Sequence, residues 1–241
     1  MGRRALSRKI KRVPPSPEAM ERYVRLWTQE EVHFHPERFP KLTSRELFGD
    51  DAPLELEVGC GTGEYLCDLA GSRPEARFVG VDPVTKVLFF AARQAEQRRL
   101  ANLRLVRATM QGLYPLLAPD SLAAIYVHFP DPFVRSRGEH KVLNARFFEA
   151  ARQALVRGGT LSVVSDQPEL FQEALGLVEE QPGLDKTHSE RHLVGFEPAL
   201  KSRYQRKWER YALPALRFEV RKTPVNGGPA RSGARARSAP P

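Results

Sequence analysis

Short apolar runs alternate with amphipathic segments through the middle of the chain. Apolar runs of strand length, rich in Val, Leu, Ile and Phe, are typical of strands buried inside a sheet. They predict strands at residues 54–58, 77–82, 103–108, 122–129, 160–166 and 217–222. Apolar residues at helical spacing predict helices at 63–72, 85–100, 144–155 and about 169–180. This alternation predicts an α/β protein with a doubly wound, mostly parallel sheet that carries helices on both faces.

The two ends of the chain differ from this central part in composition. Residues 1–17 are rich in Arg and Lys and finish in a proline-rich stretch, which predicts a flexible basic arm. Residues 226–241 are basic and of low complexity, which predicts a disordered tail. We therefore expect one folded domain at residues 18–225, with a helix near its start.

The charge balance is basic, with 38 Lys and Arg against 29 Asp and Glu and a formal net charge of +9. This balance favours polyanions, above all nucleic acid, as partners, although a basic surface also keeps a protein soluble. The cysteines are Cys60 and Cys67, whose spacing matches no metal site, so we expect reduced, buried thiols and no metal. No apolar run approaches the roughly 20 residues of a membrane-spanning helix, and no signal peptide is evident. We therefore expect a soluble cytoplasmic protein without a membrane partner.

A glycine-rich loop follows the first predicted strand. Gly59, Gly61 and Gly63 stand between that strand and a helix, where glycine permits tight turns and lets a ligand approach the backbone. Glu57 precedes the loop, and Asp82 ends the next strand, where a carboxylate can accept ribose hydroxyls. The spacing differs from the G-x-G-x-x-G of dinucleotide sites, and an acid beside the loop favours a cation over a phosphate. S-adenosylmethionine therefore fits better than NAD, unless Glu57 is an ordinary acid at a strand end.

A third contact with the adenosyl group is expected from the loop after the strand at 103–108. Thr109 and Met110 are the candidates, because apolar atoms there could cover one face of an adenine. They could equally be ordinary loop residues.

The segment FPDPF at residues 129–133 ends another predicted strand. Prolines on both sides of Asp131 restrict the backbone and would hold its carboxylate in a narrow geometry at the carboxyl edge of the sheet. Phe133 offers a flat surface on which a base could stack. A basic run from Arg135 to Lys141 could contact phosphates. In the alternative interpretation, Asp131 caps a turn and the basic run is a solvated surface.

Several of these features together resemble the bacterial tRNA (guanine-N7-)-methyltransferase family. The resemblance is carried by FPDPF, the basic run after it, an aromatic-rich helix, a Gly-Gly pair and the Ser-Asp that ends VVSD, and it spans roughly residues 54–222. It implies a seven-stranded Rossmann-like sheet, S-adenosylmethionine as the cofactor, and methyl transfer to N7 of the variable-loop guanine of tRNA. The protein would act as a monomer or homodimer.

The resemblance also implies roles for individual positions. Glu57 and Asp82 match the cofactor-binding acids of the family, and Asp131 matches its proposed catalytic, cofactor-proximal aspartate. The segment SRYQRKW at residues 202–208 matches its C-terminal motif. The implied substrate-binding residues are Arg135, Lys141, Asp166, Ser202, Arg203, Tyr204 and Gln205.

The chain departs from the family pattern at some of these positions. Thr109 and Met110 stand where the family usually has Asp-Ala, and Gln205 stands for a usual Glu, so two carboxylates are replaced. Ser202 replaces Thr and Phe133 replaces Trp, which keeps the hydroxyl and the ring. The alternatives are a methyltransferase that acts on an exocyclic adenine nitrogen, and a non-catalytic RNA-binding protein that kept the fold. An NAD-dependent oxidoreductase is disfavoured by the spacing of the loop.

Overall fold

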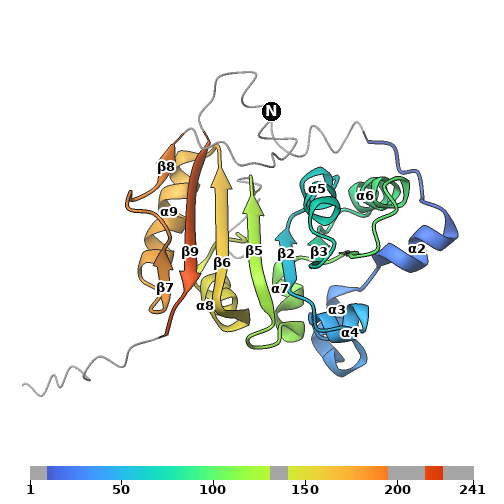
Figure 1. Cartoon of the computed structure of the whole chain (residues 1–241), viewed down its shortest axis with the longest axis horizontal. Helices are drawn as coiled ribbons and strands as arrows, with labels where there is room; N and C mark the ends of the chain where they lie inside the picture. The colour runs from blue at the N-terminus through green and yellow to red at the C-terminus, as the bar shows by residue number, and fades with distance from the viewer. Residues whose placement is uncertain (1–9, 131–140, 195–214, 225–241) are drawn as a thin grey trace, which may run out of the picture.

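The computed structural model describes residues 10–130, 141–194 and 215–224, and a nine-stranded sheet forms its centre (Figure 1). The strands follow the order β1-β4-β3-β2-β5-β6-β9-β7, and β8 pairs with β9. Neighbouring strands from β1 to β6 are parallel, whereas β9 is antiparallel to β6, β7 and β8. Their bounds are β1 Val24–Arg25, β2 Leu54–Val58, β3 Arg77–Val81, β4 Leu103–Val106, β5 Leu122–His128, β6 Leu155–Ser165, β7 Leu184–Lys186, β8 Leu193–Val194 and β9 Leu216–Lys222.

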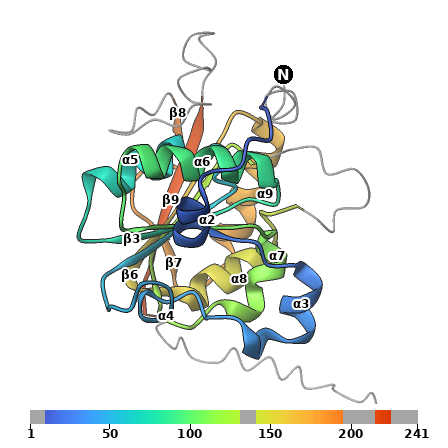
Figure 2. The same cartoon turned by 90° about the vertical axis from the view of Figure 1, so that its right-hand side faces the viewer.

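Helices cover both faces of this sheet (Figure 2). One face carries α5 and α6, and the other carries α7, α8 and α9. The helix bounds are α2 Pro17–Tyr23, α3 Gln29–Phe34, α4 Ser44–Phe48, α5 Glu64–Ser72, α6 Thr85–Gln97, α7 Met110–Leu113, α8 Ala145–Ala154 and α9 Pro168–Glu179, with 3-10 turns η1 Pro36–Arg38 and η2 Tyr114–Leu116. None of the described helices is both long and apolar enough to cross a membrane.

The order of the strands creates a break in direction at the centre of the sheet. The chain moves outward from β2 to β3 and β4, and then returns to place β5 on the other side of β2. In such sheets the connections leave β2 and β5 towards opposite faces, so a crevice opens at the carboxyl ends of these strands. The predicted cofactor loop and the FPDPF segment follow these two strands.

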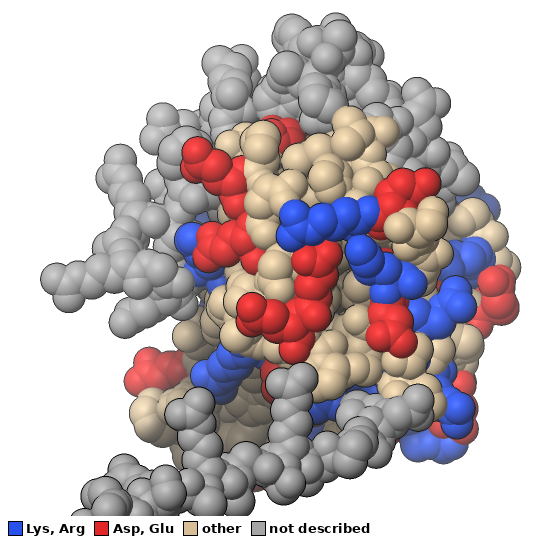
Figure 3. Space-filling view, turned by 90° about the vertical axis from the view of Figure 1, so that its left-hand side faces the viewer, with Lys and Arg blue, Asp and Glu red and all other residues tan. Residues whose placement is uncertain are grey.

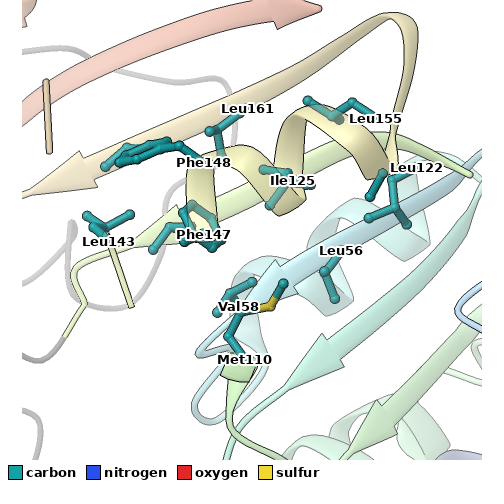
Figure 4. Close-up of a cluster of buried hydrophobic side chains, with 14 of the residues drawn as sticks. Leu56, Val58, Met110, Leu122, Ile125, Leu143, Phe147, Phe148, Leu155 and Leu161 are labelled. Atoms are coloured by element: carbon teal, nitrogen blue, oxygen red, sulfur yellow. The ribbon is translucent and has the colours of Figure 1, made fainter. Parts of the chain in front are cut away.

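The hydrophobic core lies in two layers, one on each face of the sheet. On one face, Phe147 and Phe148 of α8 pack beside Ile125 and Leu161, and all four side chains are fully buried (Figure 4). On the other face, residues of α5 and α6 pack over β3 and β4. Strands covered on both sides must be apolar on both sides, which explains why they are visible in the sequence as apolar runs.

The buried acid Glu55 is an exception to this rule, and it is neutralised locally. Both of its carboxylate oxygens accept hydrogen bonds from the Arg73 guanidinium at 2.7 Å, and the Tyr126 hydroxyl donates a further bond at 2.9 Å. Burial, and then the charge of Glu55, raise the pKa of Tyr126 above its ordinary value. The tyrosine therefore remains a neutral donor at physiological pH.

The predicted fold class is confirmed, and the differences are in detail. All six predicted strands and the four predicted central helices are present, with ends shifted by a few residues. The sheet has nine strands rather than seven in part because β1 and β8 are two-residue strands added near its edges. Two residues are too few to produce a sequence pattern. The helix expected near the start ends at Tyr23, where Val24 takes an extended conformation and begins β1.

Candidate active site

The glycine loop leaves the carboxyl end of β2 in an unusual backbone conformation. Gly59, Gly61 and Gly63 have φ values of 74°, 57° and 77°, all in the left-handed region that favours glycine. Two N–H groups at the start of the loop, those of Gly59 and Cys60, donate to the Val81 carbonyl at the end of β3. The sequence therefore places glycines where the chain needs them to turn from β2 into α5.

The second and third glycines have different surroundings. A Cβ atom on Gly63 would lie 2.6 Å from the Cβ of Ala91 in α6, so the loop is packed directly against that helix. A Cβ atom on Gly61 would meet nothing within 4 Å. The backbone at Gly61 therefore faces open space, where a ligand can approach it closely.

Asp82 joins this loop to the next strand. Its Oδ2 accepts from the Gly61 N–H at 3.0 Å, and its Oδ1 accepts from the Val84 N–H at 2.9 Å. A carboxylate has about four acceptor positions, so these two bonds are compatible with further bonds from ligand hydroxyls. The structure thus brings together two of the predicted cofactor-binding residues.

Glu57 is the second-to-last residue of β2, two positions before Gly59, and it is only 4% exposed. It is paired in register with Gly80 of β3 and Tyr126 of β5, on the face covered by α5. A Cβ atom on Gly80 would lie 2.5 Å from Leu66 of α5, so this glycine lets the helix approach the sheet beside Glu57. A buried acid beside the glycine loop favours the binding of a cation there.

Three rings line the same face and were not predicted from the sequence. Tyr65 of α5 lies 4.6 Å from His128 and 5.5 Å from Tyr126, measured between ring centroids. Burial raises the pKa of Tyr65, and the neighbouring Tyr126 and Glu57 raise it further. The alternation of β5 places Tyr126 and His128 on one face, which is the signal that could have identified them. His128 is the last residue of β5 and therefore stands next to FPDPF.

Thr109 begins α7 and fixes the loop on the other side of β3. Its hydroxyl accepts from the Gly112 N–H at 3.1 Å and donates to Oε1 of Gln29 at 3.1 Å. Gln29 belongs to α3, far away in the sequence, and no sequence signal indicated it. The Met110 side chain is 2% exposed and packs in the core beside Val58 (Figure 4). Its predicted contact with the cofactor stays a prediction, and the core packing leaves only its backbone for that role.

Lys141 and Asp166 lie at the same edge of the sheet. The Lys141 ammonium pairs with Glu173 of α9 at 2.8 Å, and its carbonyl accepts from Gln111 of α7 at 3.3 Å. Asp166 directly follows β6. The other predicted site residues, Asp131, Arg135, Ser202, Arg203, Tyr204 and Gln205, lie outside the described residues.

The chain bends sharply just before Asp131. Phe129 has a φ of +49°, which is strained for a bulky side chain, and its N–H donates to the Val164 carbonyl at 2.7 Å. Its ring packs with Val164 and Ala215 in a small separate cluster. Strain of this kind persists only where surrounding contacts enforce it, so the turn into Pro130 is a fixed feature of this edge.

The described residues show no group of side chains arranged to hold a metal ion. Cys60 and Cys67 are buried and form no disulfide. Burial raises the pKa of Cys67 to about 12, so its thiol stays protonated and inert at neutral pH.

Comparison with known proteins places the chain among methyltransferases. A family model described as "Putative methyltransferase" matches residues 51–216. A tRNA (guanine-N(7)-)-methyltransferase of Rubrobacter xylanophilus is 46% identical and covers 91% of this chain and 99% of that protein. One of Chloroflexus aggregans is 41% identical and covers 86% of this chain and 92% of that protein. Among solved structures, the 16S rRNA methyltransferase KamB has a TM-score of 0.53 at 17% identity, over 71% of this chain and 88% of that chain, which shows a shared fold.

Alanine substitutions of Gly61 and of Gly63 should affect different properties of the protein, ligand binding in the first case and stability in the second. Gly63→Ala places a methyl group 2.6 Å from Ala91 and should lower the free energy of unfolding by about 2–4 kcal/mol. Gly61→Ala meets open space, so only the backbone strain of about 1–2 kcal/mol applies. Its methyl group should instead weaken the binding of S-adenosylmethionine. Denaturant unfolding and calorimetry measure the two effects, and equal losses of stability would contradict this assignment.

The hydrogen bond between Thr109 and Gln29 should stabilise the start of α7 and the ligand edge beside it. Thr109→Val keeps the shape but removes both bonds, and should lower stability by about 1 kcal/mol and weaken S-adenosylmethionine about fivefold. Thr109→Ser keeps the hydroxyl and is the matched control. Gln29→Ala should weaken S-adenosylmethionine binding less than Thr109→Val does, and it should cause no further loss when both substitutions are present. Calorimetry of the parent protein, the two single variants and the double variant measures this. Additive effects would mean that the two side chains act independently.

Proposed function

The chain belongs to the tRNA (guanine-N(7)-)-methyltransferase family, and on this premise we propose that it transfers the methyl group of S-adenosylmethionine to N7 of the variable-loop guanine in tRNA. The resemblance noted in the sequence is thereby confirmed. Adenine methylation at an exocyclic nitrogen is the activity of other families, so it is no longer favoured. A protein that kept the fold and lost turnover remains the second candidate, because Thr109 and Gln205 replace carboxylates.

The observation that carries this proposal is the geometry of the glycine loop between Glu57 and Asp82. Gly61 leaves the backbone open to a ligand, and Asp82 holds that backbone in place while presenting its carboxylate at the same edge. Glu57 places a buried carboxyl group under the loop, and a ligand that carries a sulfonium and an ammonium and no phosphate favours the ionised form of such a group. The residues present therefore fit S-adenosylmethionine.

The reaction requires little acid–base catalysis from the protein. The cofactor supplies an electrophilic methyl group, and guanine N7 already has a lone pair in the plane of its ring and carries no proton. No general base is needed to create the nucleophile. What the protein must do is hold N7 in line with the breaking S–C bond, and such positioning can contribute about 7–11 kcal/mol in favourable intramolecular cases.

Asp131 is the residue that we assign to this step. Positive charge moves onto the imidazole ring of guanine as the bond forms, and a fixed carboxylate nearby stabilises it. The same carboxylate can accept from guanine N1–H and N2–H, which an adenine lacks. In the sequence, Asp131 follows the left-handed Phe129 by two positions and stands between two prolines, which restrict the backbone.

The remaining partners follow from this assignment. Arg135, Lys141, Arg203 and Tyr204 would contact the RNA, and Asp166, Ser202 and Gln205 would complete the pocket for the base. The proposed substrate is tRNA, and a cytoplasmic location would suit it. A monomer or a homodimer would serve equally.

The direct test is to incubate the protein with methyl-labelled S-adenosylmethionine and unmodified tRNA, and then to digest the RNA to nucleosides. Label in 7-methylguanosine is the expected result. Label in methyladenosine, or none despite measurable cofactor binding, would reject the proposed reaction. A failure to bind the cofactor by calorimetry would instead favour the non-catalytic candidate.

Substitution of Asp131 separates its two proposed effects. Asp131→Asn keeps the shape and part of the hydrogen bonding but removes the charge, so kcat should fall about 10²–10³-fold. Asp131→Ala removes both the charge and the hydrogen bonding, so its kcat should fall at least as far. Circular dichroism and cofactor affinity control for folding. A steep loss in Asp131→Ala with little loss in Asp131→Asn would show that the residue orients the base without stabilising charge.

A further inference from the structure

Three arginines lie on α2, β1 and β4, at the edge of the sheet where β1 pairs with β4. Arg22 lies in the last turn of α2, Arg25 in β1 and Arg104 in β4. Strand alternation puts Arg25 and Arg104 on the face opposite the α5–α6 core layer, since Val24, Leu103 and Leu105 belong to that layer. We call these three residues the arginine edge.

The guanidinium groups of the arginine edge lack acidic partners. Within the described part of the chain, none of the three forms an ion pair. Arg25 instead donates to the carbonyls of Glu21 and Val24 at 2.6 and 3.1 Å, and Arg104 donates to those of Leu103 and Ala101 at 2.8 and 3.4 Å. These bonds satisfy donors but leave the positive charges uncompensated.

Among the three arginines, Arg104 is the one for which burial and the repulsion between like charges are most evident. Its guanidinium lies 4.5 Å from the ring centroid of Phe48, and its Nε is buried without a hydrogen-bond partner. Burial lowers the pKa of Arg104, and the neighbouring charges of Arg25 and Arg22 lower it further. Arg77, the other cation nearby, is neutralised by Asp50 at 2.7 Å. A bound anion would relieve the mutual repulsion of the remaining three.

The opposite edge of the sheet is built differently. Lys186 and Arg191 both pair with Glu179, at 3.6 and 3.1 Å, and Lys222 pairs with Asp120 at 2.7 Å. Figure 3, which faces this side, shows basic and acidic side chains interleaved over the surface. Lys186, Arg191 and Lys222 are therefore ion-paired, whereas within the described residues the three arginines of the arginine edge are not.

The acids near the arginine edge do not cancel it. Glu18 and Glu21 are exposed on α2 and form no ion pair with its arginines, and Glu96 of α6 accepts from the Ser16 hydroxyl at 2.6 Å. The chain also enters α2 from its basic N-terminal arm, with Arg12 lying 6.0 Å from the Phe89 ring centroid.

A phosphodiester backbone is the anion that fits this arrangement. Guanidinium groups bind phosphate oxygens through paired N–H bonds, and several at once suit a chain of phosphates better than one small anion. In the sheet order, β1 is separated from β2 by β4 and β3, so at about 4.8 Å between strands the edge lies about 14 Å from the cofactor strand. A folded RNA whose guanine occupies the active site extends well beyond that distance.

We propose that Arg22, Arg25 and Arg104 form a docking surface for the phosphate backbone of the substrate RNA, separate from the pocket that receives the target base. This inference rests on the proposed function, because it takes tRNA as the substrate. The surface supplies affinity and orientation, and it takes no part in methyl transfer.

The test compares two double variants that each remove two positive charges. Arg22→Gln/Arg25→Gln acts on the arginine edge, and Lys186→Gln/Arg191→Gln acts on the ion-paired opposite edge as a matched control. Binding of an unmodified tRNA transcript is measured across a series of salt concentrations. The first variant should bind on the order of 10-fold more weakly, with a salt slope smaller by about 1–2, while the control stays within about twofold of the parent protein.

A third variant separates charge from structure. Arg22→Lys/Arg25→Lys keeps both charges and should recover most of the lost affinity, while thermal unfolding checks that all variants fold alike. In steady-state assays the Gln variant should raise KM for tRNA and keep kcat at saturating tRNA. Equal weakening by the control, no weakening by the Gln variant, or a Lys variant as weak as the Gln variant would each overturn the proposal.

Failure of this inference is distinguishable from failure of the proposed function. If the parent protein forms no 7-methylguanosine, the proposed function fails, whereas the binding comparison still decides whether the edge contacts RNA. If the parent protein forms 7-methylguanosine and the Gln variant binds tRNA as tightly, only the docking surface is rejected.

Discussion

The carboxylate of Asp82 is the contact on which the ligand edge of this protein depends. It accepts one N–H from the glycine loop after β2 and one from the start of the segment that leads into α6. The loop itself has three residues in the left-handed region and few side chains that could hold it, so a fixed acceptor is needed to select one conformation. The same carboxylate is the one predicted to bind the cofactor. If it does, stability and ligand binding are coupled at one residue.

Strand β2 shows how the chain accommodates acids in a sheet covered on both sides. Leu54, Leu56 and Val58 face one core layer, and Glu55 and Glu57 face the other. Glu55 is neutralised by Arg73 and Tyr126, and so it costs the fold little. Glu57 stands one pleat closer to the ligand edge, where Gly80 lets α5 approach. Two acids of the same strand thus have different roles, and the difference comes from their distance to the carboxyl end.

The sequence predicted the central sheet, the glycine loop and the acid at the end of the next strand because each has a strong local pattern. Buried strands are continuous apolar runs, and glycines after a strand mark a turn that other residues adopt poorly. It could not predict Gln29 beside Thr109, since this contact joins segments far apart in the chain. The burial of Met110 and the left-handed Phe129 were equally hidden, because both depend on packing rather than on pattern. The predicted roles of Asp131, Arg135 and the C-terminal motif stay predictions.

The charges of the predicted cofactor site give a reason for an RNA contact outside it, in addition to the contacts proposed for Arg135, Lys141 and Arg203. Glu57 and Asp82, the predicted cofactor-binding acids, would attract a cationic cofactor but repel a polyanion that approaches within bonding distance of them. Salt screens this repulsion over about 8–10 Å, so a phosphate backbone held farther away meets little of it. On the β7–β9 side, the basic side chains of Lys186, Arg191, Arg217 and Lys222 are ion-paired with Glu179, Glu219 and Asp120. The proposed docking surface at the arginine edge, about 14 Å from β2, lies beyond that range, and among the described residues its arginines form no ion pair that would oppose a phosphate.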